Sequence, residues 1–111
     1  MIPTMAGRRE DGVMFDRPEL DAILRVYGFM VAAGEWRDYA IDGLKDRAEF
    51  AVFRHASEVP IYRIVKTPDE ARRQGAYKVV AASGQILKRG QDLKQVLKVF
   101  DRQLVRLAAN D

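Results

Sequence analysis

The sequence predicts an α+β domain: a helix, a four- to five-stranded antiparallel meander and a second helix, with both helices packed on one sheet face. Three observations predict this class. Apolar residues recur at helical spacing in two segments, one towards each end of the chain. Between these segments the apolar period falls to about two residues, which is typical of β-strands. The connections between the strands are short and rich in turn residues, which favours antiparallel neighbours because a parallel crossover needs about a dozen residues.

The first helix is expected to begin after Asp16, whose side chain can cap it, with Pro18 at an early helical position and Glu19 near the positive end of the helix dipole. Gly34 is expected to end the helix in a left-handed conformation. Gly28 lies inside the helix, where glycine costs about 1 kcal/mol relative to alanine. We therefore expect another element to pack closely against it. The apolar residues of one helical face are Leu20, Ile23, Leu24, Tyr27, Met30 and Val31.

Five strands are expected, over residues 36–42, 48–54, 61–66, 77–82 and 85–88. Ser83 and Gly84 are typical of a tight hairpin turn between the last two strands. Pro68, Asp69 and Glu70 favour a single helical turn in the connection over residues 67–75.

The expected strands carry apolar side chains on both faces, whereas a sheet with one wet face alternates more cleanly. A second copy of the chain is the expected cover for the second face, because twofold pairs dominate soluble oligomers. The sequence therefore predicts a homodimer. The alternative is that sheet twist and loops cover these residues within one chain.

The second helix is expected over about residues 93–108, with Asp92 as its cap and Gln95 as the reciprocal partner in a variant of the capping box. Its apolar residues fall on one side and form the most regular pattern in the chain. They are Leu93, Val96, Leu97, Phe100, Leu104 and Leu107.

Residues 1–15 have no periodicity and are expected to be a disordered tail, with Phe15 as the first anchored side chain. Residues 16–111 are then a single domain, because two cores in a chain of 111 residues would each be too small.

Composition excludes several classes of protein and site. The longest uncharged apolar stretch, residues 26–34, is far shorter than the ~20 residues of a membrane span. The N-terminal residues do not match a secretory signal, so a cytoplasmic protein is expected. The chain has no cysteine and one histidine, His55, so no metal site is expected. It has no Gly-rich phosphate loop and no Rossmann fingerprint, so no cofactor is expected either. His55 stands in a polar turn with Ser57 and Glu58, but triad members come from separate parts of a fold. No enzymatic activity is expected.

Basic charge is concentrated towards the C-terminus. Residues 72–111 carry nine basic and three acidic groups, a net charge of +6, whereas residues 1–71 carry ten and thirteen, a net charge of −3. Basic residues recur every four positions in the second helix, opposite its apolar side. This surface suits an acidic protein partner or nucleic acid; the plainer alternative is a solvated helix face, since Lys and Arg are good helix formers. The candidate residues for an anionic partner are Arg72, Arg73, Lys88, Arg89, Lys94, Lys98, Arg102 and Arg106.

Three segments, RPELDAILRVYGFMVAAGEWRDYAID, RRQGAYKVV and GQILKRGQDLKQVL, carry a family resemblance. From Arg17 to about Leu107 the chain resembles an uncharacterised family of small bacterial proteins known as a domain of unknown function. The resemblance implies a small cytoplasmic bacterial protein and assigns no catalytic residue. The sequence thus predicts a non-enzymatic macromolecular interaction module that is homodimeric. The alternative is a nucleic-acid-binding protein that uses the basic second helix.

Overall fold

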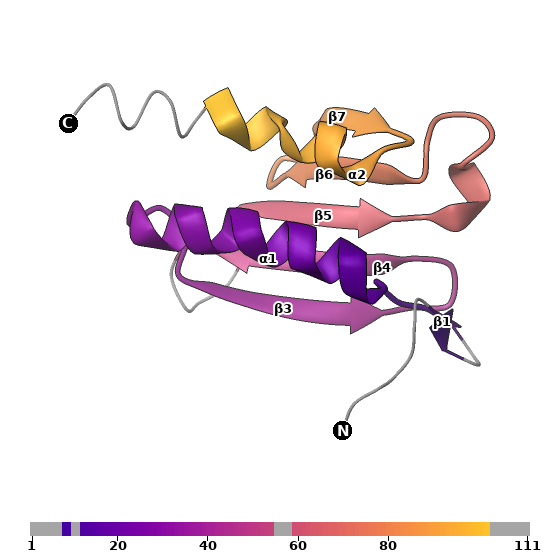
Figure 1. The fold of residues 1–111 in the computed structure, drawn as a ribbon, viewed down its shortest axis with the longest axis horizontal. Coiled ribbons are helices and arrows are strands. Elements are labelled where there is room, and N and C mark those ends of the chain that lie inside the picture. Colours follow the sequence, from indigo (N-terminus) through magenta and orange to yellow (C-terminus); the bar gives the residue numbers. More distant parts are fainter. Residues whose placement is uncertain (1–7, 10–11, 55–58, 103–111) are drawn as a thin grey trace.

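The computed structural model describes residues 8–9, 12–54 and 59–102. Strands β3 to β7 form one antiparallel sheet in the order β3-β4-β5-β6-β7, and both helices lie over the same face of that sheet (Figure 1). The predicted α+β class and the five-stranded meander are confirmed. In chain order the elements are β1 (Arg8–Arg9), β2 (Gly12–Val13), α1 (Arg17–Ala32), β3 (Asp38–Gly43), β4 (Ala48–Phe53), β5 (Tyr62–Lys66), the 3-10 turn η1 (Pro68–Glu70), β6 (Tyr77–Ala81), β7 (Ile86–Gly90) and α2 (Leu93–Leu97).

Helix α1 begins and ends as its sequence predicts. The Glu19 N–H donates to Asp16 Oδ1 at 2.9 Å, and the Asp16 N–H donates to Glu19 Oε1 at 2.8 Å, which forms a complete capping box. Gly34 follows the helix with a φ of 79°. The expected close neighbour of Gly28 is absent: a Cβ built there meets nothing within 4 Å among the described residues. Gly28 lies on the solvent side of α1, so tertiary packing within the described chain does not explain it.

The core lies between the sheet and the two helices. It takes Ile23 and Met30 from α1, the alternate residues of the central strands, and the apolar side of α2. Trp36 precedes β3 instead of lying in it, and its ring meets that of Phe100 edge-on at a centroid distance of 5.0 Å. The predicted turn at Ser83 and Gly84 is confirmed, since Gly84 has a φ of 95° between β6 and β7.

The second face of the sheet is partly covered within the chain. Val65 and Val80 are 2% and 5% exposed, although their neighbours along β5 and β6 face the helices. Long charged side chains surround the two valines. These side chains pair with one another: Glu49 accepts from Arg47 at 2.8 Å and from Arg63 at 3.4 Å. The alternative of cover within one chain therefore holds for these two residues.

Helix α2 is not continuous over its predicted range. It is regular over Leu93–Leu97, is interrupted by a turn at Lys98, and resumes over residues 99–102. The Asp92 cap is confirmed, because its carboxylate accepts from the Lys94 N–H at 3.0 Å. Gln95 is exposed and makes no reciprocal bond to Asp92 among the described residues. The predicted apolar positions Leu104 and Leu107 lie outside the described residues.

The folded chain begins earlier than residue 16. Strand β2 pairs with β1, and the Val13 N–H donates to the Leu44 carbonyl at 2.8 Å. Phe15 is buried, as expected for the first anchored side chain. Residues 12–15 therefore belong to the domain and not to a tail. Backbone pairing with the turn after β3 leaves no hydrophobic period in the sequence, so the sequence alone predicts a longer tail than the structure has.

Candidate functional site

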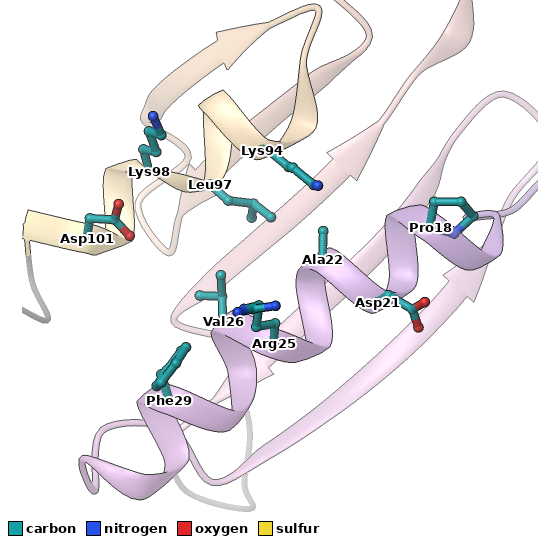
Figure 2. A pocket seen from close by; sticks show the side chains of 10 residues that line it. All are labelled: Pro18, Asp21, Ala22, Arg25, Val26, Phe29, Lys94, Leu97, Lys98 and Asp101. Atoms are coloured by element: carbon teal, nitrogen blue, oxygen red, sulfur yellow. The ribbon is translucent and has the colours of Figure 1, made fainter.

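A groove of about 590 Å³ lies between α1 and α2 and is lined by residues of both helices. Its α1 wall carries residues spaced three and four apart, so they share one flank of that helix. Ala22, Val26 and Leu97 are its apolar residues between the two helices, and Phe29 stands at one end (Figure 2). Phe29 is 56% exposed. The groove thus offers apolar surface to solvent.

Charged side chains border this apolar surface. Arg25 comes from α1 and Lys94 from α2, and Figure 2 shows Lys94 and Leu97 reaching towards α1 while Lys98 points away from it. Asp21 and Asp101 lie near the two ends of the groove (Figure 2). Within the described chain, none of these charged residues takes part in an ion pair of 4.0 Å or less.

The structure divides the predicted basic surface among several places. Both Lys94 and Lys98 line the groove, but only Lys94 reaches towards α1, and Lys98 points away from it, so the two do not form one stripe (Figure 2). The reason is that α2 lies beside α1 and is interrupted at Lys98. Arg102 is exposed on the helical residues that follow. Arg106 lies outside the described residues.

The remaining predicted residues are near the other end of α2. Arg72 and Arg73 are exposed in the connection after η1, and Lys88 is exposed on β7. Arg89 donates from Nη1 to the side-chain oxygen of Gln74, which ties the end of β7 to that same connection. The structure therefore groups Arg89 with the connection that carries Arg72 and Arg73, apart from the groove.

Sequence reasoning missed Arg25 and Phe29 as groove residues. A usable signal was present, because Arg25 is the single charged residue between Ala22 and Ala33. Asp21, Arg25 and Phe29 also follow one another at intervals of four, which places them on one helix flank. What the sequence does not carry is the position of α2 against that flank.

A polar cluster at the start of α1 was also missed. Lys66 Nζ donates to Glu19 Oε1 at 2.8 Å and to the Met14 carbonyl at 3.0 Å, and the Tyr77 hydroxyl donates to Glu19 Oε2. The side chains of Lys66 and Glu19 are only 12% and 10% exposed. Burial raises the pKa of Tyr77 above its usual value, and the hydrogen bond to Glu19 raises it further, so the phenol keeps its proton. The cluster joins α1 to β5 and β6.

The other chemical features of the described chain are sparse. No group of three or more His, Cys, Asp or Glu side chains in it is placed to hold a metal ion. His55, Ser57 and Glu58 lie outside the described residues. Among the helices that the structure describes, none combines the length and the apolar character required to cross a membrane.

Comparison with known proteins gives one finding. A family model described as "Protein of unknown function (DUF2794)" matches residues 13–97, which is more than half of the chain. Neither the curated proteins nor the solved structures gave a match. The matched range takes in α1, the whole five-stranded sheet and α2, and so includes the groove residues of α1 together with Lys94 and Leu97, whereas Lys98 and Asp101 lie beyond it. This confirms the resemblance to a domain of unknown function, and the chain belongs to the DUF2794 family.

Proposed function

We propose that this protein is a non-enzymatic protein-interaction module that forms a homodimer. The observation that carries the proposal is the apolar character of the outward side of α1. Leu24, Phe29 and Val31 are 37%, 56% and 40% exposed, and all three belong to this helix. A surface helix normally has charged or polar residues opposite its buried face. Apolar surface that remains exposed and has a polar rim is typical of an interaction site.

The exposed apolar residues occupy two flanks of α1. At about 100° per residue, Leu24 and Val31 lie well over a third of a turn away from Phe29. Phe29 borders the groove beside α2, so Leu24 and Val31 lie on the flank away from it, towards β3. Tyr39 of β3 is also exposed on that side, and its ring meets the ring of Tyr27 edge-on at 4.9 Å. We assign the dimer contact to the flank of Leu24 and Val31.

Gly28 supports a close contact on this outward side. It has open space around it in the described chain, yet glycine inside a helix costs about 1 kcal/mol. A glycine lets a second backbone approach closely because it has no Cβ. A second copy of α1 packed across Gly28 would account for this residue.

The sheet offers a less suitable contact. Val65 and Val80 of its second face are already buried. The edge strand β3 carries Asp38 and Asp42, both exposed, and the other edge strand, β7, has a register shift where it pairs with β6. Charges and bulges on edge strands discourage pairing with another chain. These features favour a contact through α1.

Light scattering at micromolar concentration tests the dimer. We expect a mass near twice the 12.6 kDa of one chain. Leu24→Gln combined with Val31→Gln should give a mass near 12.6 kDa, because both changes place polar groups in the apolar contact. The matched control is Val59→Gln combined with Ile86→Gln, which alters exposed apolar residues away from α1 and should leave the dimer intact. A native chain that scatters as a monomer would sink this part of the proposal.

The non-enzymatic part rests on the polar cluster of Glu19, Lys66 and Tyr77. Its carboxylate oxygens and ammonium group already bond to one another and to the backbone, so they are not available to a substrate. The nucleic-acid alternative is less favoured because the basic residues are divided between the groove and the end of β7. A phosphate backbone is better matched by a continuous basic surface.

A further inference from the structure

We infer that the groove between α1 and α2 binds an acidic, amphipathic segment of a partner protein. This inference rests on the proposed interaction function and adds to it the site and the chemistry of the partner. The homodimer uses the other flank of α1, so the two contacts can be tested separately.

The apolar part of the groove fits an amphipathic helix. Ala22, Val26 and Leu97 lie between the two helices, and Phe29 is more than half exposed at one end. A helix that docks in such a groove inserts apolar residues spaced three, four and seven apart. Exposed aromatic side chains beside an apolar floor are the usual anchors of protein interfaces.

The charges of the groove indicate an acidic segment. Arg25 and Lys94 approach from the two walls and Lys98 stands at the rim (Figure 2). None of these three cations has a carboxylate within 4.0 Å in the part of the chain that the structure describes. By contrast, Lys66 bonds to Glu19 at 2.8 Å and Arg63 to Glu49 at 3.4 Å. Among the described residues the groove cations have no carboxylate partner, so they are suited to pair with carboxylates of a bound segment.

The arrangement of these charges orients the bound segment. Asp21 lies towards the Pro18 end of the groove and Asp101 towards the Phe29 end, with Arg25 between them (Figure 2). Carboxylates of the partner should therefore lie near the middle of the groove, and an apolar anchor should lie beside Phe29. Like charges at the two ends disfavour an acidic segment shifted along the groove.

The same features make a protein segment a better occupant than nucleic acid. Interfaces with nucleic acid are polar and strongly positive, since their main contacts are to phosphates. Here an apolar floor lies between the cations, and two aspartates share the groove. Phosphates would leave the apolar floor unused and would meet both carboxylates.

The first experiment selects short peptides from a random display library on the full chain. We expect the enriched peptides to be acidic and to carry apolar residues at helical spacing. Amide shifts from nuclear magnetic resonance should then map their contact to Arg25, Phe29 and Lys94. No enrichment, enrichment of basic or neutral peptides, or shifts confined to another surface would each overturn the inference.

The second experiment tests the charges and the anchor with variants. Arg25→Glu combined with Lys94→Glu should weaken the selected peptide about tenfold or more and reduce its salt dependence, because rim charges act through electrostatic steering. Phe29→Ala should weaken it about tenfold as the loss of an aromatic anchor. Lys45→Glu, an exposed cation in the turn between β3 and β4, is the matched control and should leave affinity unchanged. Equal losses for the control and the groove variants would contradict a groove-specific contact.

Two further arms separate the inference from its alternatives. In one arm, a labelled DNA duplex is titrated against the native chain and the same variants. If the duplex binds more tightly than the peptide, and Arg25→Glu with Lys94→Glu abolishes that binding, the occupant of the groove is nucleic acid and not an acidic protein segment. Leu24→Gln with Val31→Gln should abolish the dimer and retain peptide binding. If the native chain is a dimer but binds no peptide, the groove inference is refuted and the proposed dimer is not.

Discussion

Gly75 and Gly90 meet backbone to backbone. A Cβ built on Gly75 would lie 2.3 Å from the carbonyl carbon of Gly90, and Gly75 has a φ of 98°. Gly75 closes the connection between β5 and β6, and Gly90 is the last residue of β7. The side chain of Gln91 also donates to the Ala71 carbonyl, so the connection is held against the end of β7 at two points.

Gly75→Ala should lower the free energy of unfolding by about 2–5 kcal/mol, because it combines a positive φ with a backbone clash. The matched control is Gly84→Ala. Gly84 has a similar φ of 95° but nothing within 4 Å of its Cβ position in the described chain, so about 1–2 kcal/mol is expected. Urea denaturation measures both. Equal losses would show that the contact with Gly90 does not matter.

Gly28→Ala should raise the free energy of unfolding by about 1 kcal/mol when measured in the monomeric Leu24→Gln, Val31→Gln background. The reason is that alanine loses less backbone entropy on folding and its methyl group meets no atom within 4 Å. Urea denaturation is again suitable. A loss of stability in that background would mean that Gly28 has a neighbour within the chain.

Leu97→Ala should cost about 2–5 kcal/mol, as expected for a large-to-small change in a core. Leu97 of α2 is 4% exposed, and its side chain lines the groove on the side towards α1. The comparison is Phe29→Ala, which changes an exposed residue of the same groove and should cost about 0.5 kcal/mol or less. A loss below half a kcal/mol for Leu97→Ala would contradict its place in the core.

The free energy of unfolding should decrease in alkaline solution because of Tyr77. Burial and the hydrogen bond to Glu19 raise its pKa in the folded chain, so above pH 10 the unfolded chain releases this proton first. The stability from the neutral phenol is complete below pH 10 and decreases as the pH rises towards the folded pKa. Urea midpoints measured from pH 8 to pH 11 should therefore fall less steeply for Tyr77→Phe than for the native chain. Parallel curves would show that the hydroxyl ionises equally in both states.

The features that follow local rules could be predicted from the sequence. Asp16 and Glu19 form the helix cap at their expected spacing, and Ser83 with Gly84 forms the expected turn. The interruption of α2 at Lys98 could not be predicted, because the apolar spacing continues through that position. The pattern of buried positions does not report a break on the exposed side.

The candidate site depends on tertiary placement, so only some of its residues could be predicted from the sequence. Lys94 and Lys98 were predicted as basic surface residues, but Arg25 stands about 70 positions earlier in the chain and joins them only because both helices pack on one face of the sheet. Glu19, Lys66 and Tyr77 come from three separate elements, and a lone charged residue in a strand gives no sign of its partner. Tertiary packing brings these three residues together, and their positions in the sequence follow no periodic pattern that would predict the contact.

The order of the sheet bears on how the chain reaches its fold. Each strand of the sheet pairs with the next strand in the sequence, so every pairing closes a short stretch of chain. Closing a loop costs more entropy as it lengthens, and folds rich in local contacts form quickly for this reason. On a nascent chain, α1 emerges before the five-stranded sheet and has no surface to cover until β4 and β5 are paired. The packing of α2 against α1, rather than the assembly of the sheet, is then the step that brings together the most distant helices of the described chain.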